Sequence, residues 1–298
     1  MTWPHNSVML QDVVDAMAPA EGEVHVDCTL GAGGHAAAML AAAPITLVGL
    51  DRDPDALEVA RERLADFADR VHLVRARFSD LPRVLDDLGL SAVDGVYADF
   101  GVSSMQLDRP ERGFSFRASG PLRMTMDPDA TFDAAALVNE ASQAELGGWI
   151  ARYGEERFAR RIARAIVQGR PWQDTEALAN AIASAVPRPD RIHPATRTFQ
   201  ALRIVVNDEL GEIEALLPAA LDALRPEGRL AFLSFHSLED RIVKRFIAEQ
   251  SGRGVPRDPY GNPIHAPRLR APARAARPSV DDPNPRARSA RLRTAVRL

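Results

Sequence analysis

Three aspartates that each end an apolar segment are the residues best placed to do chemistry: Asp27 in "VHVDC", Asp51 in "LVGLD" and Asp99 in "GVYAD". The glycine-rich stretch "GAGGHA" lies between the first two, and Asp51 follows its Gly31 by twenty residues, while Gly33 fits a G-x-G-x-x-A pattern. Glycines at this spacing let backbone N–H groups approach a ligand, and an acid about 20 residues later accepts hydrogen bonds from ribose hydroxyls. The pattern predicts a nucleoside cofactor.

The charge beside the glycines bears on which cofactor fits. A P-loop is excluded, because no Gly-Lys-Ser/Thr follows the glycines. NAD(P) and S-adenosylmethionine both carry an adenosine and both stay open. Asp27, immediately before the loop, would repel a pyrophosphate but suits the ammonium of a methionine moiety, whose carboxylate can face the loop. The order "DCTLGAGG", "GLDRD", "YADFG" is typical of Rossmann-like methyltransferases and favours S-adenosylmethionine.

The residues after Asp99 indicate a methyl acceptor. Doubly wound sheets place reacting groups at the ends of such strands. Amino-directed methyltransferases usually have Pro-Pro-aromatic after the acidic or amide residue, whereas this chain has Phe100-Gly101. A carboxylate that accepts the N–H of an exocyclic amine helps to localise the amine lone pair, so Asp99 is the catalytic candidate. Cys28, the only cysteine, lies on the first predicted strand and is rejected as a nucleophile, and no metal site is expected from ligand spacing.

Alternating segments predict the elements that position these residues. Apolar strands are expected at 23–28, 45–50, 71–76 and 94–99, with helices between them at 35–43, 54–68 and 80–88. Strands that alternate with helices over short connections predict an α/β fold with a parallel, doubly wound sheet.

The alternation stops after Asp99. A long loop at 100–131 and helices over 133–186 follow, and sheet character returns at 228–235. We therefore expect a Rossmann-like α/β sheet interrupted by a helical insertion. The expected division is a core of residues 1–105, an insertion for substrate recognition at 106–200, and a second core part with a basic tail at 201–298.

Charge is unevenly distributed along the chain. Net charge is −4, yet residues 251–298 carry eleven arginines against three aspartates. A basic tail on an acidic body indicates an anionic partner such as nucleic acid, although an arginine-rich composition could produce the same excess. The sequence lacks a secretory leader pattern and a long apolar run, so a cytoplasmic protein is expected, without a membrane partner.

Six motifs over nearly the whole chain resemble the ribosomal RNA small subunit methyltransferase H family. They are "DCTLGAGGHA", "DGVYADFGVSSMQLDRPERGFSF", "YGEERFARRIARAIV", "HPATRTFQALRIVVNDEL", "GRLAFLSFHSLEDRIVKRF" and "NPRARSARLR". The resemblance implies methylation of the N4 amine of a cytosine in the decoding region of bacterial 16S rRNA, with the 30S subunit as the expected setting and a homodimer possible. It also implies contacts to S-adenosylmethionine from seven residues: Gly33, Gly34, His35, Asp51, Phe78, Asp99 and Gln106.

The chain departs from the family pattern at three positions. Ser7 stands where the family usually has proline, and Arg123 and Thr125 alter the pattern Pro-Leu-Asp-Met-Arg-Met-Asp. The last two fall in the loop expected to cover the site, so they bear on substrate contacts more than on the reaction. A non-catalytic cofactor-binding protein and an NAD-dependent oxidoreductase are the competing functions. The first would not need the residues from Asp99 to Gln106, and the second lacks a catalytic Tyr-Lys or Cys/His pair.

Two helical segments and the tail leave further roles open. The segment 194–213 predicts one helix with an apolar stripe and a polar stripe of Thr196, Gln200, Arg203 and Asn207, either solvated or facing the site. In "RYGEERFARRIARAIV" an i,i+4 pair of Glu156 and Arg160 is expected, which favours a solvated helix. The tail's Arg286, Arg288, Arg291 and Arg293 fit an edge strand or a phosphate-tracking segment, and we expect the insertion and tail to hold rRNA.

Overall fold

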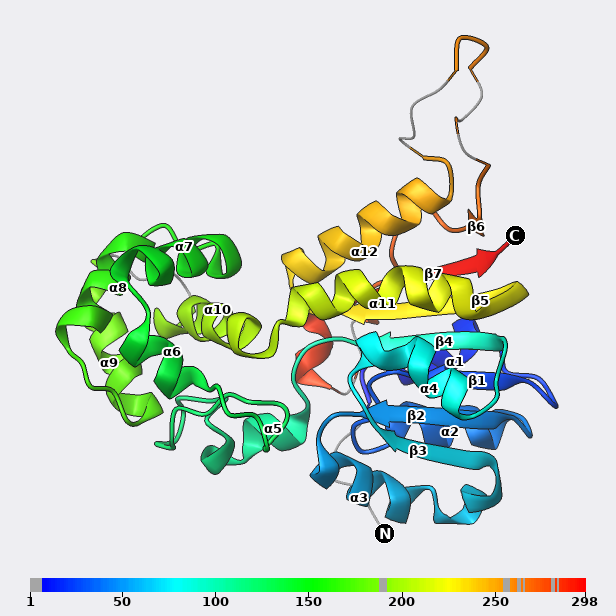
Figure 1. The fold of residues 1–298 in the computed structure, drawn as a ribbon, viewed down its shortest axis with the longest axis horizontal. Helices are drawn as coiled ribbons and strands as arrows, with labels where there is room; N and C mark the ends of the chain where they lie inside the picture. Colours follow the sequence, from blue (N-terminus) through cyan, green and yellow to red (C-terminus); the bar gives the residue numbers. More distant parts are fainter. Residues whose placement is uncertain are drawn as a thin grey trace. The chain divides into compact units, whose positions relative to one another are not determined.

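The computed structural model describes residues 7–187, 192–253, 258–261, 264, 266–279, 282 and 284–298. Two compact units divide the chain (Figure 1). The first unit consists of Met1–Gly101 together with Leu210–Leu298, and the second is Val102–Glu209. The chain therefore leaves the first unit after Gly101 and returns to it at Leu210.

A sheet forms the centre of the first unit. Among the described residues it has seven strands in the order β3-β2-β1-β4-β5-β7-β6. Its first five strands run parallel, and β7 runs antiparallel to both neighbours. The strands are β1 Val24–Asp27, β2 Thr46–Asp51, β3 Val71–Arg75, β4 Val93–Asp99, β5 Leu224–Ser234, β6 Leu269–Arg270 and β7 Arg291–Arg297. This topology confirms the predicted Rossmann-like, doubly wound sheet.

Helices cover both faces of the sheet. The helical elements of this unit are α1 Leu10–Met17, α2 Gly34–Ala42, α3 Pro54–Arg63, η1 Ala65–Arg70, η2 Phe78–Asp80, α4 Leu81–Asp87, α11 Glu209–Ala223, α12 Ser237–Gln250 and η4 Pro285–Ser289, with the first residue of α11 belonging to the second unit. Residues of α4, α11 and α12 form one buried cluster with the sheet, and residues of α1, α2 and α3 form another.

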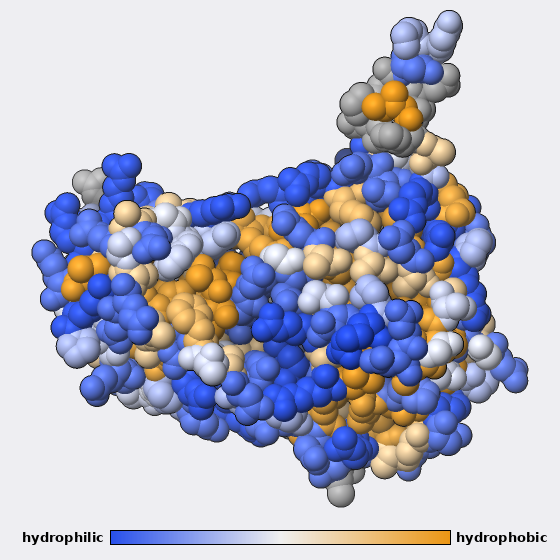
Figure 2. Space-filling view, in the orientation of Figure 1, coloured by the Kyte–Doolittle hydropathy of each residue, from blue (hydrophilic) through white to orange (hydrophobic). Residues whose placement is uncertain are grey.

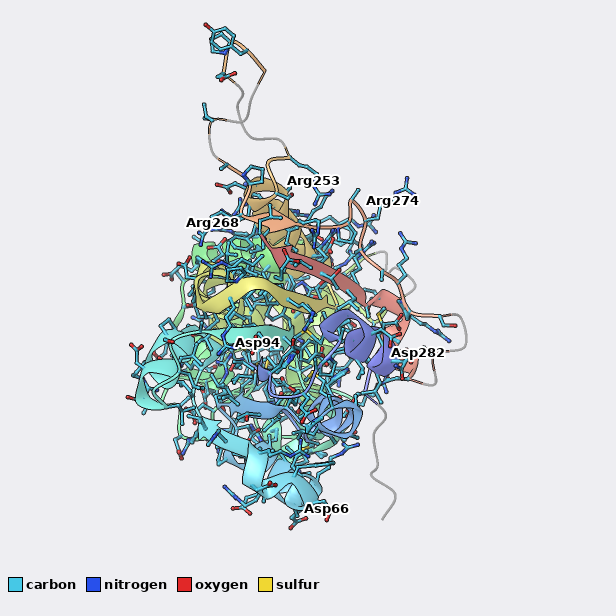
Figure 3. The ribbon with its side chains drawn as sticks, turned by 90° about the vertical axis from the view of Figure 1, so that its right-hand side faces the viewer. Asp66, Asp94, Arg253, Arg268, Arg274 and Asp282 are labelled. Atoms are coloured by element: carbon cyan, nitrogen blue, oxygen red, sulfur yellow. The ribbon has the colours of Figure 1, made fainter. Side chains whose placement is uncertain are left out.

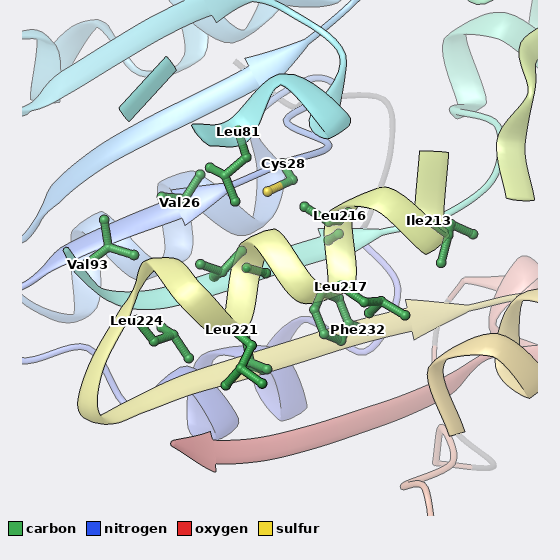
Figure 4. Close-up of a cluster of buried hydrophobic side chains, with 14 of the residues drawn as sticks. Val26, Cys28, Leu81, Val93, Ile213, Leu216, Leu217, Leu221, Leu224 and Phe232 are labelled. Atoms are coloured by element: carbon green, nitrogen blue, oxygen red, sulfur yellow. The ribbon is translucent and has the colours of Figure 1, made fainter. Parts of the chain in front are cut away.

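Alternation along the strands produces these two cores. In β4, Val96 and Ala98 join the cluster of α4, α11 and α12, whereas Tyr97 between them joins the cluster on the other face. Successive strand side chains point to opposite faces of a sheet, so a strand covered on both faces must be apolar throughout. Figure 4 shows α11 lying across the sheet, with Leu217 near Phe232 of β5.

The second unit is helical and has a core of its own. Its elements are α5 Ser104–Asp108, η3 Pro110–Arg112, α6 Ala134–Glu140, α7 Gln143–Gly154, α8 Ala159–Gln168, α9 Thr175–Ala185 and α10 Ala195–Asn207. The expected uninterrupted loop at 100–131 instead contains the two short helical elements α5 and η3. Side chains at helical spacing, such as Leu146 and Ile150 of α7, bury the core.

The unit boundaries differ from the expected divisions at 105/106 and 200/201. They lie at Gly101/Val102 and at Glu209/Leu210. Helix α10 runs without a break through the expected second division and ends at Asn207, followed by the C-cap Asp208, whose φ of 49° is left-handed. The predicted single helix over 194–213 is wrong for the same reason, because Leu210 and Ile213 belong to the separate helix α11.

The C-terminal segment completes the sheet. Strand β7 pairs with β5 along its length and with the two residues of β6, so it is flanked on both sides and is no edge strand. The Arg293 guanidinium donates to both carboxylate oxygens of Asp240 at 2.7 and 3.1 Å, and Arg291 lies 4.0 Å from the same carboxylate. Arg288 is exposed, and the side chain of Arg286 lies outside the described residues.

Other arginines of the tail pair with groups of the first unit, to which the tail itself belongs. Arg268 pairs with Asp222 at 2.5 Å, and Arg270 pairs with Glu227 at 3.0 Å. Arg297 donates to the carbonyls of Leu221 and Asp222 in the last turn of α11, where a cation also suits the helix dipole. Figure 3 shows Arg268 near the end of the unit where α12 ends. Much of the tail's excess charge is therefore balanced internally.

Within the described residues, no helix has the length and apolar character needed to cross a bilayer.

Candidate active site

Three carboxylates meet at one edge of the sheet. Asp27, Asp51 and Asp99 are the last residues of β1, β2 and β4, which are adjacent and parallel. Asp51 binds both loops beside it: Oδ2 accepts from the Gly31 N–H at 2.8 Å, and Oδ1 accepts from the Asp53 N–H at 2.9 Å. A direct hydrogen bond thus joins the glycine-rich loop to Asp51, the residue predicted to accept from the ribose hydroxyls.

Thr29 links Asp27 to the backbone of Asp99, and the sequence analysis missed it. Its N–H donates to Oδ1 of Asp27 at 3.1 Å, while its Oγ1 accepts from the backbone N–H of Asp99 at 2.6 Å. The ends of β1 and β4 are therefore joined by one hydroxyl residue. The available signal was Asp-x-Thr at a strand end, a pattern in which the aspartate bonds the backbone two residues later.

Burial shapes the electrostatics of this edge. It raises the pKa of Asp27 to about 7, with a smaller contribution from the charge of Asp51. Burial also raises the pKa of Asp51, against hydrogen bonds from Asp53 and Gly31 that lower it. The pKa of Asp99 lies well above its usual value because of burial and the nearby Asp27 and Glu239 charges.

One carboxylate oxygen of this cluster is unpaired within the described part of the chain. Oδ1 of Asp99 is buried and has no hydrogen-bond partner among the described residues. Buried acceptors are normally paired, and a buried carboxylate is stabilised by a positive or N–H-bearing group. The arrangement of Asp27, Asp51 and Asp99 is therefore complementary to a cation or to an N–H donor.

Helix α2 adds backbone donors beside the carboxylates. Gly33 forms its N-cap with a left-handed φ of 71°, and the helix begins at Gly34. The first N–H groups of a helix have no intrahelical partners and carry its positive dipole end, so they suit a carboxylate. A Cβ on Gly34 would lie 2.0 Å from Oγ of Ser7, so a larger residue here would displace the Ser7 side chain.

The His35 side chain connects α2 to neighbouring segments of the first unit. Its Nε2 lies 2.9 Å from the Val8 carbonyl, and its Nδ1 lies 3.1 Å from the Tyr97 hydroxyl. Burial lowers the pKa of His35 to about 4, so the ring is neutral at physiological pH. Both ring nitrogens of His35 thus have partners within the protein. The predicted contact of His35 with the cofactor is therefore expected from its backbone N–H in the first turn of α2.

Phe78 offers an apolar wall at the end of β3. Its ring centroid lies 5.9 Å from that of Phe100, and the guanidinium of Arg52 lies 6.0 Å from its centroid. Phe100 in turn stacks on Phe232 at 5.8 Å. Partly buried aromatic faces of this kind bind flat heterocycles such as adenine.

Gln106 lies in the second unit, on α5. It is buried and forms a capping box with Ser103: its Oε1 accepts from the Ser103 N–H at 3.0 Å, and its N–H donates to Ser103 Oγ at 3.2 Å. Its contact with the cofactor stays a prediction.

Glu239 is a second residue that the sequence analysis missed. It is fully buried at the start of α12 and accepts from the N–H groups of Phe235 and His236 at 2.8 and 3.2 Å. A Cβ added to Gly101 would lie 3.7 Å from its Oε1, so Glu239 faces the turn that follows Asp99. The capping pattern His-x-x-Glu in "FHSLEDR" was the available signal.

Cys28 points away from this edge. It is buried in the apolar cluster beside Leu81 and Val26, as Figure 4 shows, and burial raises the pKa of its thiol well above the usual value. This environment agrees with its rejection as a nucleophile.

The polar stripe of α10 is engaged inside the second unit. Asn207 accepts from the Met126 N–H at 2.8 Å and donates to the Met124 carbonyl at 2.7 Å. Arg203 makes a two-pronged pair with Glu209 at 2.7 and 2.8 Å, and Gln200 donates to the Tyr153 carbonyl at 3.0 Å. These residues hold their surroundings in place, and only Thr196 is exposed.

The loop with the two sequence departures is fixed by similar bonds. Arg112 donates to the carbonyls of Thr125 and Met126 at 3.1 and 3.0 Å, and Thr125 is buried. Arg123 instead donates to the Pro128 carbonyl at 3.0 Å and is exposed. Thr125 is thus part of the packed loop, whereas Arg123 lies on its surface.

Comparison with known proteins identifies the chain. A sequence model of the MraW methylase family matches residues 2–298. The chain belongs to this family. Ribosomal RNA small subunit methyltransferase H of Thermobifida fusca is 50% identical over 307 residues, which cover 98% of this chain and 93% of that protein. The protein of the same name from Geobacter sulfurreducens is 49% identical over 315 residues and is covered completely, as is this chain. An rRNA methylase structure from Streptococcus thermophilus has a TM-score of 0.46 at 10% identity, covering 100% of this chain and 99% of that one.

A member of the MraW methylase family is a methyltransferase, and S-adenosylmethionine is its methyl donor. The residues at the sheet edge fit that donor. Its ammonium and sulfonium groups are cations, which match the clustered carboxylates and the unbound Asp99 oxygen. Its carboxylate matches the first N–H groups of α2, and its adenosine matches Asp51 and Phe78. A pyrophosphate would add negative charge next to Asp27, so the predicted choice against NAD is supported by the structure.

Proposed function

We propose that this enzyme methylates the exocyclic N4 amine of a cytosine in the decoding region of bacterial 16S rRNA. The names of its relatives, ribosomal RNA small subunit methyltransferase H, support a ribosomal RNA substrate. The 30S particle is the proposed setting of the reaction. The absence of a metal requirement, a cytoplasmic location and a homodimer stay predictions of the sequence.

The unbound carboxylate oxygen of Asp99 carries the proposal of an amine as acceptor. An exocyclic base amine delocalises its lone pair into the ring, and it becomes a better nucleophile when its N–H is accepted by a carboxylate. Asp99 presents such an oxygen at the end of β4, in a buried setting where a hydrogen bond is stronger than in water. A C5-directed mechanism would need a thiol here, and the buried Cys28 points elsewhere.

Each residue of the edge has a distinct proposed part. Asp51 accepts from the ribose hydroxyls, Phe78 contacts the adenine, and Asp27 faces the ammonium group. The first N–H groups of α2, at Gly34 and His35 beside the Gly33 cap, bind the carboxylate.

Asp99 orients the amine toward the methyl group, which the bound donor supplies as an electrophile on a positively charged sulfur. Alignment of this kind lowers the barrier chiefly through positioning. Gln106 remains the proposed contact from the second unit.

The decisive experiment follows a labelled methyl group. Purified enzyme is incubated with methyl-labelled S-adenosylmethionine and either free 16S rRNA or 30S particles, and the RNA is then digested to nucleosides. We expect the label in N4-methylcytidine, with the 30S particle as the better substrate. Label in another nucleoside, or none in either RNA, would refute the proposed reaction. Asp99→Ala in parallel shows whether the signal depends on this site.

A further inference from the structure

Helix α8 carries three exposed arginines on one face: Arg160, Arg161 and Arg164. We call these three residues the α8 basic face. Arg160 and Arg164 are four residues apart and Arg161 and Arg164 are three apart, so they are neighbours on the helix surface. The opposite face is buried in the core of the second unit through Ile162 and Ile166. Figure 2 shows mainly hydrophilic side chains along the rim of this unit where α7 and α8 lie.

Within the described parts of the chain, no acidic group pairs with this face. Helix α8, "ARRIARAIVQ", contains no aspartate or glutamate. Glu156, the expected i,i+4 partner of Arg160, is instead 3.4 Å from Arg197 and accepts from the Phe158 N–H at 2.8 Å. Among the described residues none forms an ion pair or hydrogen bond with the side chains of the three arginines. The sequence-based prediction that Glu156 pairs with Arg160 is therefore wrong.

The arrangement costs the free protein stability. Like charges at i,i+3 and i,i+4 destabilise a helix. Arg160 and Arg161 also lie in the first turn, where cations oppose the helix dipole. A local arrangement that works against stability is expected where it serves binding.

The α8 basic face does not reflect a general excess of positive charge in the second unit. Residues 102–209 contain fourteen arginines and fourteen acidic residues, so their formal charge is zero. Many of the other arginines are engaged, as Arg112, Arg170 and Arg203 illustrate through their bonds to carbonyls or carboxylates. The three arginines of α8 are therefore a local concentration of unbalanced charge in a neutral unit.

We propose that the α8 basic face binds phosphate groups of the RNA substrate. The proposal rests on the proposed function, which supplies a polyanion as substrate. The planar guanidinium fork suits phosphate oxygens, and phosphate contacts position a nucleic acid without reading its sequence. The face therefore contributes affinity and salt dependence, while the base is chosen elsewhere.

The test compares two triple variants of equal charge change. R160Q/R161Q/R164Q removes the α8 basic face. R61Q/R83Q/R268Q removes three exposed arginines that pair with Glu58, Asp87 and Asp222 in the first unit. Binding of 16S rRNA and of an unrelated RNA of equal length is measured from low to physiological salt. For the first variant we expect affinity to fall about 10–100-fold for both RNAs, and the slope of log K against log salt to fall by about 2–3. The second variant should keep the wild-type slope.

A conservative variant and two further readouts separate binding from folding. R160K/R161K/R164K keeps the charge, so it should retain most of the salt slope. S-adenosylmethionine binding should be unchanged in all variants, because the substitutions are exposed and the proposed cofactor residues, except Gln106, belong to the first unit. R160Q/R161Q/R164Q should melt no lower than the wild type, because it removes like-charge pairs from α8. In methylation assays the KM for RNA should rise for R160Q/R161Q/R164Q, while kcat at saturating RNA is kept, the pattern of lost uniform binding.

The outcomes distinguish this inference from the proposed function. An R160Q/R161Q/R164Q enzyme that folds and shows the wild-type salt slope and KM overturns the inference, whatever the wild type methylates. A wild type that leaves 16S rRNA unmethylated refutes the proposed function, while a reduced RNA salt slope in the variant would still support the α8 basic face. Loss of binding to phosphatidylglycerol vesicles with unchanged RNA binding would assign the face to a membrane surface and overturn the RNA proposal.

Discussion

The carboxylate edge of the sheet and the α8 basic face both gather charges of one sign, but under opposite conditions of burial. Asp27 is buried and Asp51 and Asp99 are partly buried, and burial, with a smaller contribution from neighbouring negative charges, raises the pKa values of all three. The α8 arginines lie in water, where repulsion is weak and screened by salt. A buried cluster is therefore sensitive to pH and selective for a small ligand, whereas an exposed one is sensitive to salt and suits a long polyanion. The comparison predicts that variants in the two regions affect different measurements.

The largest effect is expected from Asp99→Ala. Loss of the carboxylate that accepts the amine N–H should lower kcat by about 10²-fold or more, a size typical of a positioned acid–base group. Single-turnover methyl transfer to 30S particles measures it. The salt slope of RNA binding should stay that of the wild type, because no phosphate contact is removed. A variant with normal kcat would end the assignment of Asp99.

Asp51→Ala should act on cofactor affinity next. It removes the acceptor of the Gly31 and Asp53 N–H groups as well as the proposed ribose contact. Because hydrogen bonds to charged groups contribute about 1.5–3 kcal/mol, we expect the Kd for S-adenosylmethionine to rise about 10–100-fold. Titration calorimetry measures the change, with the exposed Asp86→Ala as a control of equal charge. Equal affinities for the two variants would contradict the proposed role.

The pH dependence of the buried cluster gives a third prediction. The pKa of Asp27 is about 7 in the folded protein against an ordinary 3.8, so the folded state holds a proton that the unfolded state has released. Stability due to this group is present at low pH and is lost as the pH rises through about 7. A cationic ligand prefers the ionised carboxylate, so S-adenosylmethionine affinity should rise over the same range, with proton release.

Asp27→Asn should remove both trends, because the amide does not titrate. At pH 8 the variant is expected to melt about 2–4 °C higher, which corresponds to about 1 kcal/mol for a chain of this size, and to bind the cofactor about 10-fold more weakly. Melting curves and calorimetry at pH 6 and pH 8 provide the test. A variant whose affinity keeps the wild-type pH dependence would show that another group carries the titration.

The smallest effect is expected from Arg268→Gln in the C-terminal region. This arginine is about half exposed and pairs with Asp222 at the surface. Such pairs contribute about 0–1 kcal/mol, so stability, methyl transfer and RNA salt slope should all stay near wild type. A marked loss of RNA affinity would show that the tail, as the sequence alone indicated, is a phosphate-binding region after all.

The sequence predicted the strand ends well because strong local signals mark them. Apolar runs that end in Asp27, Asp51 and Asp99 leave little freedom in a parallel sheet, whose strand ends share one edge. Glycine spacing likewise located the start of α2. Thr29 was missed because its hydrogen bond with the Asp99 N–H joins two strand ends that lie far apart in the sequence, which no local pattern specifies. Glu239 was missed although its capping pattern is local, because that pattern does not show that Glu239 faces the turn after Asp99.

Charge was harder to interpret from the sequence, because composition does not say which arginines are paired. The tail has a large excess of arginine, yet Arg293 and Arg297 bind Asp240 and helix carbonyls in the fold. The neutral second unit instead leaves Arg160 and Arg164 unbalanced, since their expected partner Glu156 is engaged by Arg197. Pairing across long sequence separations decides the outcome, and it becomes visible only in three dimensions.

The place of β4 in the sheet has a consequence for the order in which the protein is made. Strand β4 ends at Asp99, but its parallel neighbour β5 begins at Leu224, and the whole second unit is synthesised between them. The growing chain therefore presents one open edge of β4 throughout that interval. Such edges promote aggregation, and pairings of long sequence separation form slowly. A chaperone that covers β4 until β5 emerges would be expected to raise the yield of soluble enzyme more than one that acts after synthesis.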